Sequence, residues 1–351
     1  MRKSAVQHRL VVPRGYRPLL GVRETERAIK ELKDFFEMNL ATELNLSRVT
    51  APLFVRGGTG INDDLNGVEQ PVRFAIRDLP GVRAEIVQSL AKWKRLQLAA
   101  LGFEPGYGLY TDMNALRPDE TLDNTHSVYV DQWDWERVIS PQERNVAFLQ
   151  RIVRKIYGIL KRAEHFIFER YPAIRPALPD EPVFIHAEAL RARFPRLDPR
   201  QREQRLLQEC GAAFIIGIGG ALSDGTIHDG RAPDYDDWST PTPDGNAGLN
   251  GDLFVWNPVL QTAFELSSMG IRVDAAALRR QLKIRGCPER ARLFWHRKLL
   301  AGELPPSIGG GIGQSRLCMY FLRKAHVGEI QASLWPDTML AACQRHGIPL
   351  L

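Results

Sequence analysis

Two long segments of the sequence carry apolar residues at helical spacing. Over residues 25–44 these residues recur every three or four positions, and the same period runs through residues 143–170. This spacing places the apolar side chains on one side of an α-helix. Both segments are therefore predicted to be amphipathic helices. Their apolar stripes are Ile29, Leu32, Phe36 and Leu40 in the first, and Val146, Leu149, Val153, Ile156 and Leu160 in the second.

The segment 127–138 has a period of two and predicts a long β-strand, because alternate residues of a strand point to opposite faces. One face mixes apolar with polar residues, which a buried face does not ordinarily do. Two interpretations stay open: an edge strand with a solvated face, or a polar floor under a bound zwitterion. The mixed face carries Val128, Val130, Gln132, Asp134 and Glu136, and the other carries Ser127, Tyr129, Asp131, Trp133 and Trp135.

The order of the remaining predicted elements indicates an α+β fold. Strands, helices and strands again follow one another without the regular alternation of a doubly wound fold, which favours a mostly antiparallel sheet flanked by helices. We expect an N-terminal arm over residues 1–24 and a single catalytic domain over 25–351. Strands or extended pieces are expected at 48–55, 72–76, 85–87, 109–113, 214–218, 252–256 and 264–266, and helices at 88–101, 274–284, 288–301 and 314–322.

Composition and charge limit the kinds of partner that the protein is expected to bind. The chain is 44% hydrophobic and 25% charged, as expected of a globular protein. Its formal net charge is +6, but Lys and Arg are dispersed and do not interleave with aromatic residues. We therefore expect no nucleic-acid partner, and an anionic nucleotide would suit the same charge balance.

Cysteine spacing and hydropathy indicate a cytoplasmic protein. The four cysteines, at 210, 287, 318 and 343, form no CxxC pair, so a zinc site is not expected and reduced thiols are. The N-terminus has no apolar run of signal-peptide length, and no stretch is apolar enough to span a bilayer.

Several segments are candidates for chemistry. Glycines before the helix that begins near Gln314 let the backbone approach an anion, with Arg316 one turn in, although an ordinary turn is the alternative. Ser89 and Lys94 share a helix face loosely; the alternative is that Lys92 and Lys94 are solvated lysines that flank a core Trp93. The polar loop 223–251 either binds a cation or is simply solvated.

Taken together, the motifs resemble the ammonia-dependent asparagine synthetases. The match covers roughly residues 25–335 and is specific because long segments occur in the same order. That family is similar to the catalytic core of aspartyl-tRNA synthetase, so the resemblance implies a class II synthetase fold and a homodimer. The segments that carry it include Ser89-Leu-Ala-Lys-Trp-Lys94, Leu116-Arg-Pro-Asp-Glu120, His126-Ser-Val-Tyr-Val-Asp-Gln-Trp-Asp-Trp-Glu136, Arg231-Ala-Pro-Asp-Tyr-Asp-Asp-Trp238, Gly248-Leu-Asn-Gly-Asp252, Phe264-Glu-Leu-Ser-Ser-Met-Gly-Ile-Arg-Val273 and Gly309-Gly-Gly-Ile-Gly-Gln-Ser-Arg316.

The resemblance implies an AMP-forming aspartate–ammonia ligase that passes through β-aspartyl adenylate. Asp134 pairs with the ammonium of aspartate, and Lys94 and Arg272 hold carboxylates. The remaining aspartate-binding residues are Ser89 and Gln132.

The resemblance also implies how ATP and ammonia are handled. Arg117 clamps the α-phosphate of ATP and Arg316 the γ-phosphate. Asp63 is the ammonium-binding group and possible base, with Asp64 as the alternative, and Asp236 lies near the same centre. The other implied contacts are Glu120, Gly311, Gly313 and Ser267 to ATP, and Asp252 and Glu265 to Mg²⁺.

Three departures from the pattern are visible. The Arg117-to-Glu120 segment is one residue longer than the synthetases' Arg-x-Glu, so either acid in it is a candidate for the nucleotide contact. Ala91 stands where the aspartyl enzymes carry Gln. We also expect about seventeen more N-terminal residues than the family has.

Ammonia is expected as the nitrogen donor, because no N-terminal Cys marks a glutaminase. Two alternatives remain: a paralogue of aspartyl-tRNA synthetase that lacks the anticodon-binding domain, and an inactive sensor of aspartate or ATP.

Overall fold

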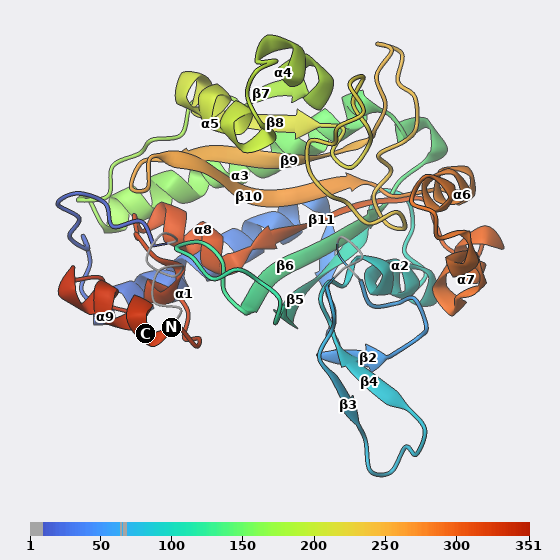
Figure 1. The fold of residues 1–351 in the computed structure, drawn as a ribbon, viewed down its shortest axis with the longest axis horizontal. Coiled ribbons are helices and arrows are strands. Elements are labelled where there is room, and N and C mark those ends of the chain that lie inside the picture. Colours follow the sequence, from blue (N-terminus) through green and yellow to red (C-terminus); the bar gives the residue numbers. More distant parts are fainter. Residues whose placement is uncertain (1–9, 64, 66–68) are drawn as a thin grey trace.

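A computed structural model describes residues 10–63, 65 and 69–351, and its centre is an eight-stranded sheet (Figure 1). The strand order is β1-β5-β6-β11-β10-β9-β8-β7. The strands are β1 (Leu46–Arg48), β5 (Gly108–Leu116), β6 (Tyr129–Val138), β7 (Val183–His186), β8 (Ala212–Ile216), β9 (Asn250–Asn257), β10 (Thr262–Ile271) and β11 (Ser307–Gly313).

Pairing in this sheet is mostly antiparallel, which confirms the expected fold class. Only the two outer pairs, β1 with β5 and β7 with β8, are parallel. Strand β6 pairs with β5 on one side and β11 on the other. The edge-strand interpretation of 127–138 is therefore wrong, because both edges of this strand are used for backbone hydrogen bonds.

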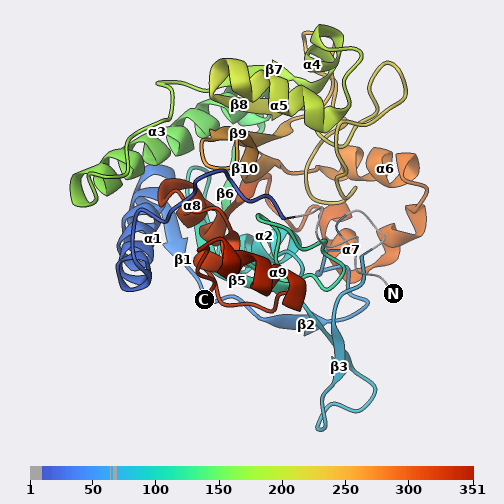
Figure 2. The same cartoon turned by 60° about the vertical axis from the view of Figure 1, so that its left-hand side comes forward.

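Helices α1 (Val22–Leu44), α3 (Val146–Arg170) and α8 (Gln314–Phe321) cover one face of the sheet. Figures 1 and 2 show α1 and α3 side by side, and Phe35 stacks on Phe166 with ring centroids 4.3 Å apart. Trp133 and Trp135, which the alternation placed on one face of β6, are fully buried in this core. Apolar burial of this extent is the main favourable term in folding.

The opposite face of the sheet is only partly covered by helices. Helix α2 (Ala91–Ala100) lies at the β5–β6–β11 end, and α4 (Ala187–Arg193) and α5 (Pro199–Cys210) cover β8 and β9. The gap between these helices is where polar side chains of the sheet remain accessible. Helices α6 (Ala275–Ile284) and α7 (Phe294–Leu300) border it, with the 3₁₀ turn η2 (Pro288–Arg292) between them.

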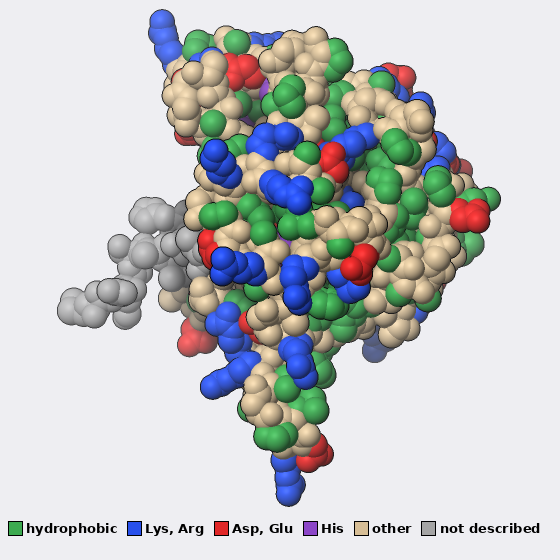
Figure 3. Space-filling view, turned by 90° about the vertical axis from the view of Figure 1, so that its right-hand side faces the viewer, with side chains coloured by type: hydrophobic (Ala, Val, Ile, Leu, Met, Phe, Trp, Pro, Cys, Tyr) green, Lys and Arg blue, Asp and Glu red, His purple; other side chains and the backbone are tan. Residues whose placement is uncertain are grey.

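A second, three-stranded sheet projects from the body. Its order is β2-β4-β3, with β2 (Phe54–Arg56), β3 (Arg73–Ala75) and β4 (Arg83–Ile86), and Phe54 packs edge-on against Phe74. Figure 3 shows this arm at the bottom and Lys and Arg side chains dispersed over the same face.

Five of the described strands and α-helices were not expected from the sequence: β7, α4, α5, β11 and α9 (Asp337–Arg345). Only three residues of α5 are buried, so it carries too few apolar positions for a clear stripe. Its N-cap Asp198, followed by Pro199 and by Gln201 at the third position, is the signal that could have found it. The glycines 309–311 and 313, interpreted as a turn, form strand β11 instead.

The chain before α1 runs along the C-terminal region. Val11 exchanges backbone hydrogen bonds with the Asn124 side chain, and Tyr16 donates to Glu329. Residues 1–9 of the expected arm lie outside the described residues. Within the described part of the chain, no helix is long and apolar enough to cross a membrane.

Candidate active site

A cavity of about 290 Å³ opens on the partly covered face of the sheet. It brings together residues from distant parts of the sequence, most of which the sequence analysis had selected. The selected residues that line it are Asp63, Ser89, Arg117, Glu120, Gln132, Asp134, Asp236, Glu265, Arg272 and Gly311.

Strand β6 supplies the floor of this cavity. Gln132 and Asp134 point into it because they alternate with the tryptophans of the opposite face. Gly311 of β11 pairs with Asp134 across the sheet, and a Cβ at 311 would stand 2.5 Å from the Gln132 Oε1. A side chain at this glycine would displace Gln132, so the strand needs glycine to leave the floor open.

Lys94 lies beneath the floor and does not line the cavity. Its side chain is fully buried and its ammonium group donates to Asp134 Oδ1, to the carbonyl of Trp135 at 3.0 Å and to that of Gly310 at 3.1 Å. Burial lowers the pKa of Lys94, and Asp134 opposes that effect. Because three acceptors occupy its three protons, Lys94 orients Asp134 in this structure.

Asp134 keeps one oxygen for another partner. Its Oδ2 is buried and has no hydrogen-bond partner among the described residues. A buried carboxylate oxygen without a partner is costly, so it is a natural contact for a cationic ligand group.

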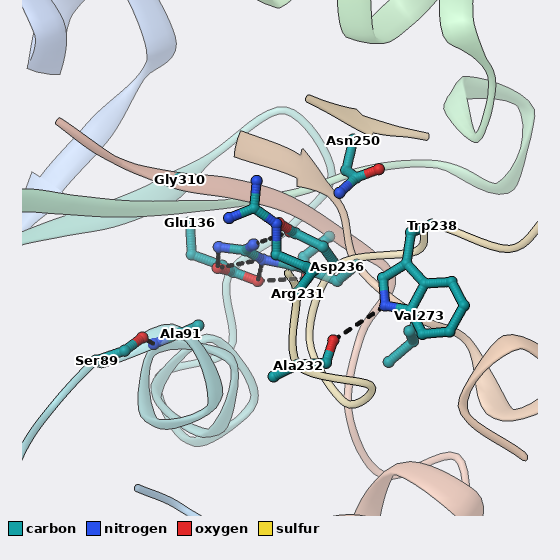
Figure 4. Close-up of polar contacts among 12 residues, drawn as sticks. Ser89, Ala91, Glu136, Arg231, Ala232, Asp236, Trp238, Asn250, Val273 and Gly310 are labelled. Carbon is teal, nitrogen blue, oxygen red and sulfur yellow. Dashed lines mark hydrogen bonds and ion pairs between the residues drawn. The ribbon is translucent and has the colours of Figure 1, made fainter. Parts of the chain in front are cut away.

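Arg272 connects two buried carboxylates at the side of the cavity. It donates to Glu136 through Nε and Nη2, at 3.1 and 3.0 Å, and to Asp236 through Nη1. Burial would raise the pKa of Glu136, but Arg272 and Lys94 outweigh it, so this pKa lies below its usual value. Figure 4 shows Glu136 and Asp236 gathered with Arg231 above the start of α2.

Arg231 was not assigned a role from the sequence, yet it lines the cavity. It donates to Asp252 Oδ1 and lies 3.7 Å from Asp236. Burial raises the pKa of Asp252 to about 7; Arg231 opposes this shift, and Glu265 and Asp229 reinforce it. Negative charge therefore accumulates around these three acids, where Arg231 pairs with Asp252 and Arg316 with Glu265.

A larger cavity of about 1030 Å³ adjoins the first, since Asp229 and Glu265 line both. Arg316 lies in this second cavity. Its guanidinium contacts the Phe264 ring at 5.9 Å from the centroid and donates to Glu265 Oε2 at 3.4 Å and to the Thr125 carbonyl at 3.4 Å. Arg117 and Arg316 therefore reach adjoining cavities that meet at Glu265.

Asp63 and Arg117 approach the first cavity from two loops. Asp63 is 3% exposed, and its Oδ1 accepts from the backbone N–H of Leu65 at 3.2 Å. Arg117 donates to the carbonyl of Gln88 at 3.1 Å, just before Ser89. The alternative acid Asp64 lies outside the described residues.

The ATP contact assigned to Ser267 does not reach the lining of either cavity. Its hydroxyl donates to the Gly311 carbonyl at 3.0 Å, and Ser268 lines the first cavity instead. A β-bulge between Glu265 and Ser267 explains the difference, because it resets the alternation along β10. Gly313 is also outside the lining, beside the Arg316 side chain.

The carboxylates of Asp252 and Glu265 could hold Mg²⁺ if a bound phosphate group supplied further oxygen ligands. In the described residues, no group of three or more His, Cys, Asp or Glu side chains could hold a metal. Glu265 lines both cavities, whereas Asp252 is buried outside both linings and is paired with Arg231. The two nonetheless offer hard oxygen donors on neighbouring strands. Two carboxylates completed by phosphate oxygens are a usual arrangement for Mg²⁺.

Solved structures with the same fold are synthetases. An asparaginyl-tRNA synthetase from Pyrococcus horikoshii, complexed with asparaginyl-adenylate, matches with a TM-score of 0.65 at 15% identity, covering 89% of this chain and 70% of that one. The aspartyl-tRNA synthetase of Entamoeba histolytica matches with a TM-score of 0.60 at 13% identity, covering 88% and 58%. The fold is thus the class II synthetase fold that the resemblance implied.

Sequence comparisons identify the family. A family model described as aspartate-ammonia ligase matches residues 23–347. An aspartate–ammonia ligase of Bacteroides thetaiotaomicron is 58% identical over 342 residues, which is 97% of this chain and 99% of the relative. One from Clostridium perfringens is 56% identical over 343 residues, or 98% and 99%. The expected seventeen extra N-terminal residues are a wrong prediction, because these alignments cover nearly all of both chains. The chain belongs to the aspartate–ammonia ligase family.

Proposed function

We propose that this protein makes L-asparagine from L-aspartate, ammonia and ATP, releasing AMP and pyrophosphate. The observation that carries the proposal is the convergence of Arg117, Asp134, Asp236, Glu265 and Arg272 on one cavity in a chain of this family. The asparaginyl-tRNA synthetase of the same fold was solved in complex with asparaginyl-adenylate, which agrees with an adenylate route.

Aspartate would lie on the β6 floor. Its ammonium group would contact the unpartnered Oδ2 of Asp134, a charge-assisted contact. Arg272 and Gln132 would meet its carboxylates, and Ser89 lines the same wall. Lys94 would act here by holding Asp134 in place, since its own protons are engaged within the protein.

ATP would occupy the join between the two cavities. Arg117 would contact the α-phosphate and Arg316 the γ-phosphate, with Glu120 on the nucleotide side. Asp252 and Glu265 would hold Mg²⁺, which when bound neutralises charge on the phosphates. Arginines placed in advance at phosphorus can supply most of the catalysis of such a transfer.

Two displacements complete the reaction. First, a β-carboxylate oxygen of aspartate attacks the α-phosphorus, and the bond from that phosphorus to the bridging oxygen breaks, so that pyrophosphate leaves. Second, the nitrogen of ammonia attacks the β-acyl carbon, and the bond from this carbon to the AMP oxygen breaks. Asp63 would hold ammonium and take a proton, and Asp236 lies on the same cavity.

We also propose that the protein is a homodimer, as the resemblance implies, and that it is cytoplasmic, as the cysteine spacing and hydropathy of the sequence indicate. Sedimentation equilibrium tests the assembly: a mass near twice 39.7 kDa supports it, and a monomer at micromolar concentration contradicts it.

The function is tested with purified protein, Mg²⁺, ATP and aspartate. Aspartate-dependent exchange of labelled pyrophosphate into ATP is expected without ammonium, and asparagine with one AMP is expected when ammonium is added. Asparagine formed only with glutamine would overturn the donor assignment. Aspartyl-tRNA formed in place of asparagine would favour the aspartyl-tRNA synthetase alternative.

A further inference from the structure

A buried ion cluster lies behind the cavity and belongs to none of the roles above. Its centre is Asp234, which is fully buried. A single oxygen, Oδ2, accepts from Lys92 Nζ at 3.0 Å, from Arg290 Nη2 at 2.6 Å and from His296 Nε2 at 2.9 Å. Burial would raise the pKa of Asp234, but Lys92, His296 and Arg290 outweigh it and this pKa is lowered.

Two of the segments that meet in this cluster also deliver residues to the cavity. Asp234 lies between Arg231 and Asp236, both of which line it. Lys92 follows directly on Ala91, another lining residue, at the start of α2. A shift of Asp234 therefore moves the wall formed by 231–236 relative to the start of α2.

Helix α7 ties a third segment to the same centre. The backbone N–H of Trp295 donates to the Thr59 carbonyl at 3.1 Å, and its indole N–H donates to the Lys92 carbonyl at 2.7 Å. His296 packs against Gly60, where an added Cβ would stand 2.9 Å from Nδ1. Gly60 has φ +74°, a conformation that favours glycine. Three residues later the same loop reaches Asp63.

Asp63 and the 231–236 segment meet in the cavity. Tyr235 and Asp63 both line it, and Tyr235 is half-buried. Desolvation and the charge of Asp63 raise the pKa of Tyr235. The groups assigned to phosphate lie elsewhere: Arg117 follows β5, Arg316 is on α8 and Glu265 is on β10. The cluster therefore reaches Asp63 through α7 and the 59–63 loop, and Asp236 along its own segment.

We propose that Asp234, with Lys92 and His296, is a positioning cluster that sets the distance between Asp63 and Asp236 and thereby governs the attack of ammonia. This inference rests on the proposed function and deepens it. Asp234 touches no substrate and acts through the residues on either side of it. Removal of its charge loosens the ammonia side of the cavity and leaves the phosphate side in place.

The test compares two reactions in the Asp234→Asn variant. Misplacement by about 1 Å can cost on the order of 100-fold in rate, so kcat/KM for ammonium is expected to fall by about 10- to 100-fold. Aspartate-dependent pyrophosphate exchange should stay within about threefold of the unaltered protein. Glu164→Gln is the matched control, because Glu164 is a carboxylate that is 3% exposed in α3 on the other face of the sheet.

The outcomes separate positioning from mere stability. If exchange and ammonia use fall in parallel, or if neither changes in folded protein, the inference is overturned. Should Asp234→Asn not fold, His296→Ala decides by the same two assays, because it keeps the Lys92 and Arg290 contacts. If the unaltered protein catalyses neither reaction, the proposed function itself fails. That result differs from a failure of this inference, in which the unaltered protein is active.

Discussion

The two faces of strand β6 carry opposite kinds of side chain, one apolar and one charged. One face buries Trp133 and Trp135 against helices, and Trp133 stacks on Phe36 with centroids 5.0 Å apart. The other face buries charge, in the pairs Lys94–Asp134 and Arg272–Glu136. Both faces bury side chains, yet burial itself favours folding only on the first.

The difference indicates that the tryptophan face contributes mainly to stability and the charged face mainly to function. Buried ion pairs contribute little net stability, because desolvation offsets their attraction. They hold donors and acceptors in place without solvent, which is what a preorganised site requires. Substitutions on the tryptophan face should therefore change folding, and substitutions around the cavity should change catalysis.

The largest expected effect is on the cavity side. Arg117→Ala should lower kcat for asparagine formation on the order of 10⁴-fold, because an arginine at a transferring phosphoryl group is worth that much. Steady-state kinetics with saturating aspartate measure it. The matched control is Arg137→Ala, which removes an arginine from the same sheet outside the cavity lining and should keep activity within about threefold. Equal losses in both variants would contradict the division between the faces.

The reciprocal substitution is Trp133→Ala. The free energy of unfolding should fall by about 3–5 kcal/mol, the usual cost of truncating a buried aromatic residue. Urea denaturation followed by circular dichroism measures it. The folded fraction should keep its KM for ATP and aspartate. A large rise in either KM with little loss of stability would mean that the two faces are not separable.

His326 should make the folded protein less stable at low pH. Burial lowers the pKa of His326 to about 4, against 6.5 for an ordinary histidine, and Asp123 opposes this only in part. As the pH falls below about 6.5, the unfolded chain takes up a proton that folded His326 does not, so stability is lost down to about pH 4. The loss is about 3 kcal/mol from this group.

The His326→Asn variant isolates this contribution, because an Asn side chain can still accept from the Gly328 N–H as His326 does at 3.0 Å. Between pH 7 and pH 4 its free energy of unfolding should fall less steeply than that of the unaltered protein. Parallel pH profiles for the two proteins would show that His326 is not the source.

The smallest expected effect concerns the loop beside Arg316. Asn124 accepts from the Val11 N–H at 2.7 Å and donates to the carbonyls of Val11 and Ala325, which fixes the turn whose Thr125 carbonyl meets Arg316. Asn124→Ala should raise KM for ATP by about tenfold, roughly 1.4 kcal/mol, with KM for aspartate unchanged. The control Asn39→Ala, on α1, should change neither constant. A rise in KM for aspartate without a rise in KM for ATP would refute this role of Asn124.

Periodicity predicted much of the scaffold. The stripe of α1 and the alternation of β6 are local properties. The first marked the buried face of the helix, and the second put Trp133 and Trp135 on the face opposite Gln132 and Asp134. Helix α5 was missed because its sequence is mostly polar, and β11 because a glycine run carries no alternation.

The site was predictable where motif and alternation agreed. Gln132 and Asp134 follow from both. Ser267 did not reach the cavity because a bulge changes parity, which no local pattern reveals. The cluster of Lys92, Asp234 and His296 joins residues far apart in sequence, so only the tertiary structure brings it to light.

The transfer of oxygen from aspartate to AMP tests the central claim most directly. Aspartate labelled with ¹⁸O in its β-carboxylate is converted with ATP and ammonium, and the products are analysed by mass spectrometry. Activation on the polar face of β6 predicts one labelled oxygen in each AMP formed. Label in pyrophosphate or inorganic phosphate, or AMP without label, would contradict it.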